Sequence, residues 1–118
     1  MMCAGNFSGG CHNEEGTAEY VVNFNGANAT TLGGFGFHAT PSRTFRLQDT
    51  ISAISWSPMT WYKIDLELDT TAKTITLHVN DQLVATRAIA PPSFAYQHVV
   101  ITSGDATVWV DDLNVIKE

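Results

Sequence analysis

Basic residues are scarce in this chain of 118 residues: six Lys and Arg oppose twelve Asp and Glu, giving a formal net charge of −6. Binding to nucleic-acid phosphates needs a basic patch, so the composition predicts no nucleic-acid partner. The same negative charge disfavours an anionic membrane surface. No apolar run approaches the roughly 20 residues that span a bilayer, so no membrane partner is expected.

Cysteine is also scarce, since only Cys3 and Cys11 occur and both lie in a stretch without periodicity. A disulfide between them and a pair of free thiols both remain open. Residues 1–6 lack a basic region followed by an apolar core, so no signal peptide is visible. We therefore expect a protein that is cytoplasmic, or exported with its signal removed.

What the chain has in abundance is alternation of apolar and polar residues, most clearly over residues 61–69, 73–80 and 108–115. This period of two is typical of half-buried antiparallel strands. We predict an all-β fold, a two-sheet antiparallel β-sandwich formed by residues 18–118 as a single domain. Residues 1–17 show no period, and we expect an irregular N-terminal arm there.

The strands are expected at residues 18–25, 33–38, 45–47, 62–69, 74–79, 83–89, 99–102 and 107–116. Residues 50–60 fit either a short strand or one helical turn. Asn80-Asp81 predicts a tight hairpin turn, because both residue types tolerate positive φ. Leu113 and Val115 are one residue out of phase with the valines before them, which predicts a β-bulge at Asp111-Asp112.

Three segments in this order resemble the second half of the concanavalin A-like jelly rolls, which include lectins, laminin-G-like modules and β-glucanases. They are the Trp-led strand from Trp61 to Asp69, the hairpin with Asn80-Asp81 at its tip, and the last strand from Val110 to Val115. The resemblance implies a jelly-roll topology. The chain is short for such a fold, so a strand could be missing and an edge left for a second subunit to cover.

Asp65, Glu67 and Asp69 stand at alternate positions, so they point to one face of their strand. The glucanases of the resembling superfamily carry Glu-x-Asp-x-Glu on a strand, whereas this chain has Asp-x-Glu-x-Asp. The row is typical of a solvated polar face opposite an apolar one. We predict no catalytic residues, with a glycan-active hydrolase as the less favoured alternative.

Two tryptophans are expected on outward faces: Trp109 is out of phase with its flanking valines, and Trp61 shares a face with Asp65. Exposed rings stack on the apolar faces of sugars, while groups such as Asp65 and His78 bond hydroxyls. We therefore expect a non-catalytic, lectin-like module that binds carbohydrate or a related polyhydroxyl ligand. The alternative is a structural module that forms a homodimer through a sheet edge.

The resemblance also implies a metal site, because the aspartate of the last strand helps bind structural calcium in several members of the superfamily. That position is Asp111 here. A bulge would expose the carboxylate and carbonyl oxygens that calcium prefers. The alternative is that one aspartate of the pair caps the bulge by bonding nearby backbone amides. No other cofactor is predicted, since the histidines share no metal-binding spacing.

Overall fold

The computed structural model describes residues 2–5, 18–26, 31–38, 43–48, 50–57, 60–90, 98–101 and 107–116. Within these ranges the chain forms ten strands and no helix, which confirms the predicted all-β class. Accordingly, no helix in the described ranges is long and apolar enough to cross a membrane. The strands are β1 (Met2–Gly5), β2 (Ala18–Asn25), β3 (Thr31–His38), β4 (Thr44–Leu47), β5 (Thr50–Ser55), β6 (Ile64–Asp69), β7 (Thr74–Val79), β8 (Gln82–Ala88), β9 (His98–Ile101) and β10 (Thr107–Val110).

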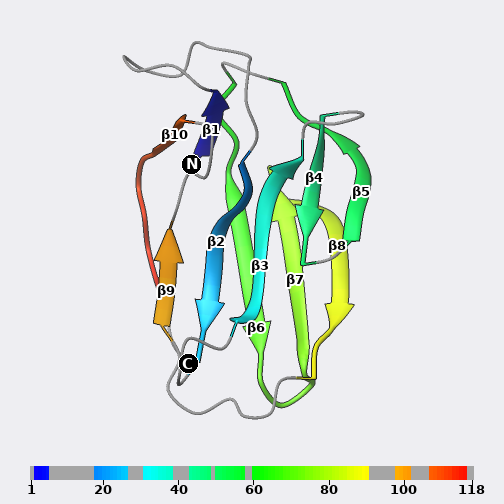
Figure 1. Ribbon diagram of the computed structural model, residues 1–118. Helices are drawn as coiled ribbons and strands as arrows, with labels where there is room; N and C mark the ends of the chain where they lie inside the picture. The colour runs from blue at the N-terminus through cyan, green and yellow to red at the C-terminus, as the bar shows by residue number, and fades with distance from the viewer. Residues whose placement is uncertain are drawn as a thin grey trace.

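Two antiparallel sheets form the body of the protein, which confirms the predicted β-sandwich (Figure 1). One sheet has the order β5-β4-β3-β2-β9, and the other has the order β6-β7-β8. Strands β1 and β10 form a separate two-stranded antiparallel ribbon. Strands β6 and β9 therefore end their sheets, and β6 lies behind β2 and β3 in the view of Figure 1.

The core lies between the two sheets because alternate side chains of each strand point inward. Phe35 and Phe37 of β3 are fully buried, as are Ile75 and Leu77 of β7 in the facing sheet. Each such side chain contributes roughly 1.5–3 kcal/mol by leaving water. Aromatic contacts extend the core, since the Phe37 ring lies 5.2 Å from that of Trp56.

The two turns of the β6-β7-β8 sheet follow from their residue types. Asn80 and Asp81 have φ values of 51° and 66°, so the predicted positive-φ hairpin between β7 and β8 is confirmed. Between β6 and β7, Oδ1 of Asp69 accepts hydrogen bonds from the backbone N–H groups of Thr71 (2.9 Å) and Ala72 (2.8 Å). This carboxylate closes the turn and sets the register of β6 against β7.

The prediction of an irregular arm over residues 1–17 is wrong for residues 2–5, which form β1. A strand of four residues is too short to show a period, and its pairing with β10 is set by distant chain. Cys11 lies outside the described residues, so its pairing with Cys3 is still open. The ambiguous stretch at 50–60 forms β5 over its first half, followed by the buried Trp56.

The last strand is also shorter than predicted, because β10 ends at Val110 and not at Ile116. Asp112 has a φ of 55°, which interrupts the extended chain where the sequence predicts a bulge. Oδ1 of Asp111 accepts a hydrogen bond of 2.9 Å from the backbone N–H of Asp112. The bond is of the kind that the sequence offered as the alternative to calcium at Asp111, but no β-bulge forms there in the described chain, because β10 and its ladder end at Val110.

Candidate functional site

The free edge of β6 forms the base of the candidate site, since within the described chain this strand pairs with β7 alone. The N–H of Asn80 donates to the carbonyl oxygen of Lys63 at 2.8 Å, so residues 63 and 80 form a hydrogen-bonded pair. Bonded and non-bonded pairs alternate along an antiparallel ladder. Ile64, Leu66 and Leu68 therefore point their backbone N–H and C=O groups away from β7, toward the open side of the sandwich.

A groove of about 1060 Å³ runs along this edge. Residues of β6 form one wall, and residues of β2 and β9 in the other sheet form the opposite wall. The chain that follows β10 runs down the same side of the molecule, beyond β9 in Figure 1, and its Val115 and Ile116 also line the groove. The groove thus lies on the side of the sandwich where the edge strands of the two sheets, β6 and β9, come together.

The rim of the groove is acidic, because the exposed row on β6 faces it. Asp65 and Glu67 are exposed, while Ile64 and Leu66 between them are half-buried, as the alternation predicts. Asp69 continues this row but is engaged in the β6–β7 turn through its Oδ1. Among the described residues, Glu67 has no hydrogen-bond or ion-pair partner, so its carboxylate can accept hydrogen bonds from a ligand.

Two histidines join the carboxylates from different elements. His78 of β7 stands directly opposite Asp65 in the ladder, and both side chains line the groove. His98 of β9 lines it from the other sheet. The structure therefore brings together Asp65 and His78, two of the residues that the sequence suggested for binding. Imidazole can donate or accept, so it complements carboxylates that accept only.

The floor of the groove is apolar. Leu66 and Leu68 of β6 line it together with Phe24 of β2 and Val99 of β9. All four are partly buried hydrophobic side chains that pack against the core. Because they are held by the core on one side, they offer the groove an apolar surface on the other. The arrangement combines a polar rim with an apolar floor, so it offers both kinds of surface to a ligand that has hydroxyl groups and apolar faces.

Lys63 is the basic residue at the β7–β8 hairpin end of this edge. Its Nζ lies 2.7 Å from Oδ1 of Asp81 and 3.9 Å from Oδ2 of Asp65. The hydrogen bond to Asp81, followed by the charges of Asp81 and Asp65, raises the pKa of Lys63 above its ordinary value. Lys63 also lines a second cavity of about 360 Å³, with Asp111 and Asp112 on the opposite wall.

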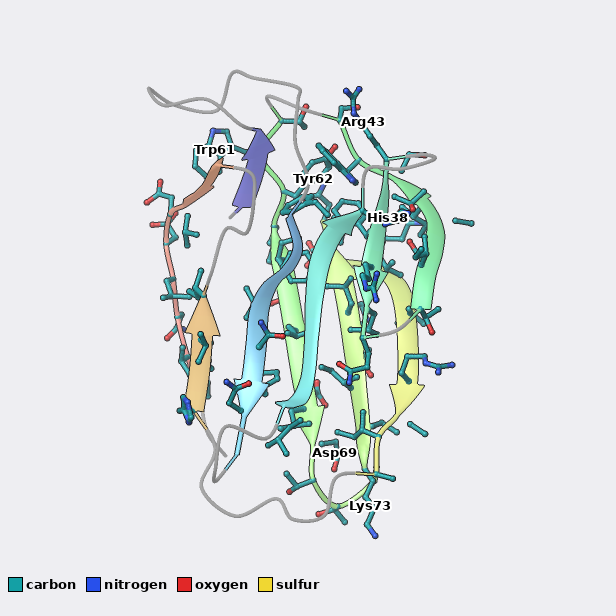
Figure 2. All side chains as sticks on the ribbon, in the orientation of Figure 1. His38, Arg43, Trp61, Tyr62, Asp69 and Lys73 are labelled. Atoms are coloured by element: carbon teal, nitrogen blue, oxygen red, sulfur yellow. The ribbon has the colours of Figure 1, made fainter. Side chains whose placement is uncertain are left out.

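The other predicted site residues lie elsewhere. Trp61 is 40% exposed, as expected, but it does not line the groove and lies near the upper end of the sandwich in Figure 2. Trp109 stands in β10 opposite Cys3, and its side chain lies outside the described part of the chain. Around Asp111 the described residues hold no cluster of three His, Cys, Asp or Glu side chains placed to bind a metal. Calcium binding at Asp111 stays a prediction.

Sequence reasoning missed Phe24, His98 and Val99, which reach the groove from the five-stranded sheet. The alternation of β2 places Phe24 on the inner face, but it does not tell which strand of the other sheet lies opposite. That pairing of sheets arises from chain far apart in sequence. To predict that His98 lines the same groove as the acidic row on β6, the arrangement of strands in both sheets would have to be known.

No protein-family model matches the chain, and neither a curated protein nor a solved structure matches it.

Proposed function

We propose that this protein is a non-catalytic, lectin-like module that binds carbohydrate or a related polyhydroxyl ligand in the groove along β6. The observation that supports this proposal is the combination of a carboxylate and imidazole rim with an apolar floor. Sugars present many hydroxyl donors around rings whose C–H faces are apolar. Carboxylates such as Asp65 and Glu67 accept from the hydroxyls, while Phe24 and Leu66 contact the ring faces.

The size of the groove suits a ligand larger than one sugar ring. Its volume of about 1060 Å³ lies just above the range of roughly 300–1,000 Å³ that is typical of small-molecule sites. The row of carboxylates follows the strand direction, with one carboxylate about every 7 Å, twice the rise per residue of an antiparallel strand. A linear oligosaccharide lying along β6 would meet successive acceptors, which favours chains of sugars over free monosaccharides.

Binding is favoured over hydrolysis by what the three carboxylates already do. Glycosidases use two carboxyl groups that act as a pair on opposite sides of the scissile bond. Here Asp69 closes the turn to Thr71 and Ala72, and Asp65 lies 3.9 Å from the ammonium group of Lys63. Only Glu67 is left with neither task in the described chain. We therefore assign to Asp65 and Glu67 the role of accepting hydroxyl hydrogen bonds.

The same row argues against the alternative of a homodimer formed edge to edge through β6. In an antiparallel β6–β6 pair, Asp65, Glu67 and Asp69 of one copy would stand on the same face as those of the other. Like charges directly opposite each other destabilise a sheet. Self-association through this edge is therefore not the function that the groove favours.

A glycan array probed with the full chain tests the proposal, followed by affinity measurements with the best oligosaccharide. Removing a carboxylate that accepts a ligand hydroxyl costs about 1.5–3 kcal/mol, or roughly tenfold or more in dissociation constant. We expect that loss for Asp65→Ala and for Glu67→Ala. Trp61→Ala is the control. The Trp61 ring is exposed but lies outside the groove, so the variant should bind the oligosaccharide with the affinity of the wild type.

Two results would contradict the proposal. One is the absence of binding to every glycan on the array at high protein concentration. The other is binding that survives both carboxylate substitutions but is lost in Trp61→Ala, because it would move the site to the exposed tryptophan. Release of free sugar from a bound polymer, abolished in Glu67→Gln, would instead identify the protein as a hydrolase.

A further inference from the structure

The residues that follow β10, residues 111–116, carry the sequence pattern of a strand without forming one. Leu113 and Val115 alternate with the polar residues Asp112 and Asn114. Even so, no residue of this C-terminal segment, residues 111–116, belongs to a strand or pairs with one in the described chain. Leu113, Val115 and Ile116 are 58%, 60% and 73% exposed. Adjacent apolar side chains exposed to this degree on a small domain indicate a surface that becomes covered.

The C-terminal segment and the unpaired edge of β6 line the same two cavities, and they run in the same direction. Between Lys63–Asp65 and residues 110–114 lies the cavity of about 360 Å³, and the larger groove follows between residues 65–71 and residues 115–116. Later residues of the segment thus face later residues of β6, as in a parallel pair. Figure 1 shows the segment descending beyond β9, on the side of the molecule on which both β9 and β6 end their sheets.

We infer that the C-terminal segment pairs with β6 as a fourth, parallel strand of the β6-β7-β8 sheet, in a closed state that alternates with the open one described here. The backbone groups of Ile64, Leu66 and Leu68 that point away from β7 would gain partners. Leu113 and Val115, which share one face of the segment, would leave water and cover the partly buried leucines of β6.

The junction at Asp111-Asp112 provides the pivot for this movement. Asp112 holds a φ of 55°, and the Oδ1 of Asp111 accepts from the Asp112 N–H at 2.9 Å. Aspartate adopts both this left-handed conformation and the extended one, and a large change in φ and ψ at this one residue would redirect the chain that follows. The phase shift between Val110 and Leu113 also fits two strand segments joined by one irregular residue.

Closure would fill the groove, because Val115 and Ile116 already line it. The segment would then compete with a ligand for the same space. This consequence rests on the proposed function, whereas the pairing itself does not, and hydrogen exchange measured without any ligand tests the pairing alone.

The experiment is amide hydrogen exchange by NMR on the full chain. The wild type is compared with two proline variants, Asn114→Pro and Val115→Pro. We expect the amides of Leu66 and Leu68, which point away from β7, to exchange at least tenfold more slowly in the wild type than in whichever proline variant disrupts the pairing more. Neighbouring residues of a strand point their N–H groups to opposite edges, so one of the two substitutions removes a donor to β6. Asn114→Ala is the matched control and should exchange as the wild type does.

Protection of the Ile75 and Leu77 amides in the central strand β7 reports whether each variant is folded. Equal exchange of Leu66 and Leu68 in the wild type and in both folded proline variants would overturn the inference. A second measurement needs no variant: the wild type should show backbone nuclear Overhauser contacts between residues 113–116 and residues 64–68. Their absence would overturn it as well, even if the proline variants fail to fold.

Discussion

Two neighbouring glycines of β3 should respond very differently to the same substitution. A Cβ added to Gly34 would meet the side-chain oxygen of Asn23 and would lie 2.7 Å from the backbone carbonyl oxygen of Val22. That carbonyl belongs to the β2–β3 ladder and cannot move without disturbing it. Overpacking of this kind costs about 1–3 kcal/mol, offset by about 0.4–1 kcal/mol because alanine restricts the unfolded chain. Gly34→Ala should therefore lose about 1–2 kcal/mol.

In a domain of this size such a loss lowers the melting temperature by roughly 4–8 °C. Gly33→Ala is the control, because its Cβ would meet the terminal methyl of Ile75 at 2.5 Å and other Ile75 atoms only at 3.5 Å or more. A methyl group at the end of a side chain can rotate away, so Gly33→Ala should lose less than half as much. Thermal unfolding followed by circular dichroism compares the two. A larger loss for Gly33→Ala than for Gly34→Ala would refute this reasoning.

Other substitutions test single interactions. Trp56→Phe removes the buried hydrogen bond of 2.8 Å from Nε1 to the carbonyl oxygen of His38, and urea unfolding should show a loss of about 1–3 kcal/mol. Asp69→Ala deletes the acceptor for two turn amides and should lower the free energy of unfolding by about 0.5–2 kcal/mol, as loss of a helix cap does. Asp69→Asn keeps an acceptor oxygen and should cost less, so equal losses in the two variants would refute the role of Asp69 in the turn. The raised pKa of Lys63 means that its contribution to stability is present at neutral pH and disappears as pH rises through the pKa of the folded state. Melting curves of the wild type and Lys63→Gln should therefore converge at high pH and in high salt, and a constant difference would contradict the ion pair with Asp81.

Local features of the fold could be predicted from the sequence because neighbouring residues determine them. The alternation from Ile64 to Asp69 indicated both the strand and its exposed face. Asn80 and Asp81 indicated a positive-φ turn and adopt one. Each of these features depends on side-chain period or on the conformational tolerance of one residue type.

Features set by distant chain could not be predicted in the same way. Residues 2–5 form a strand only because β10 provides a partner, and four residues carry no usable period. The strand after Val110 was predicted too long, since the sequence does not show whether Leu113 and Val115 find a partner. For the groove, the sequence supplied Asp65 and His78, which are neighbours in one ladder, but not His98, which comes from the other sheet.

The most direct test of the proposed function is an NMR titration of the full chain with the oligosaccharide that binds best on the array. Backbone amide shifts should concentrate at residues 65–69, at His78 and at His98, which line the groove from both sheets. The amides of Arg46 and Gln48, in and just after β4 of the five-stranded sheet and outside the groove, should stay unchanged. Shifts confined to β4 or to the surroundings of Trp61, with none along β6, would contradict the assignment of the groove as the carbohydrate site.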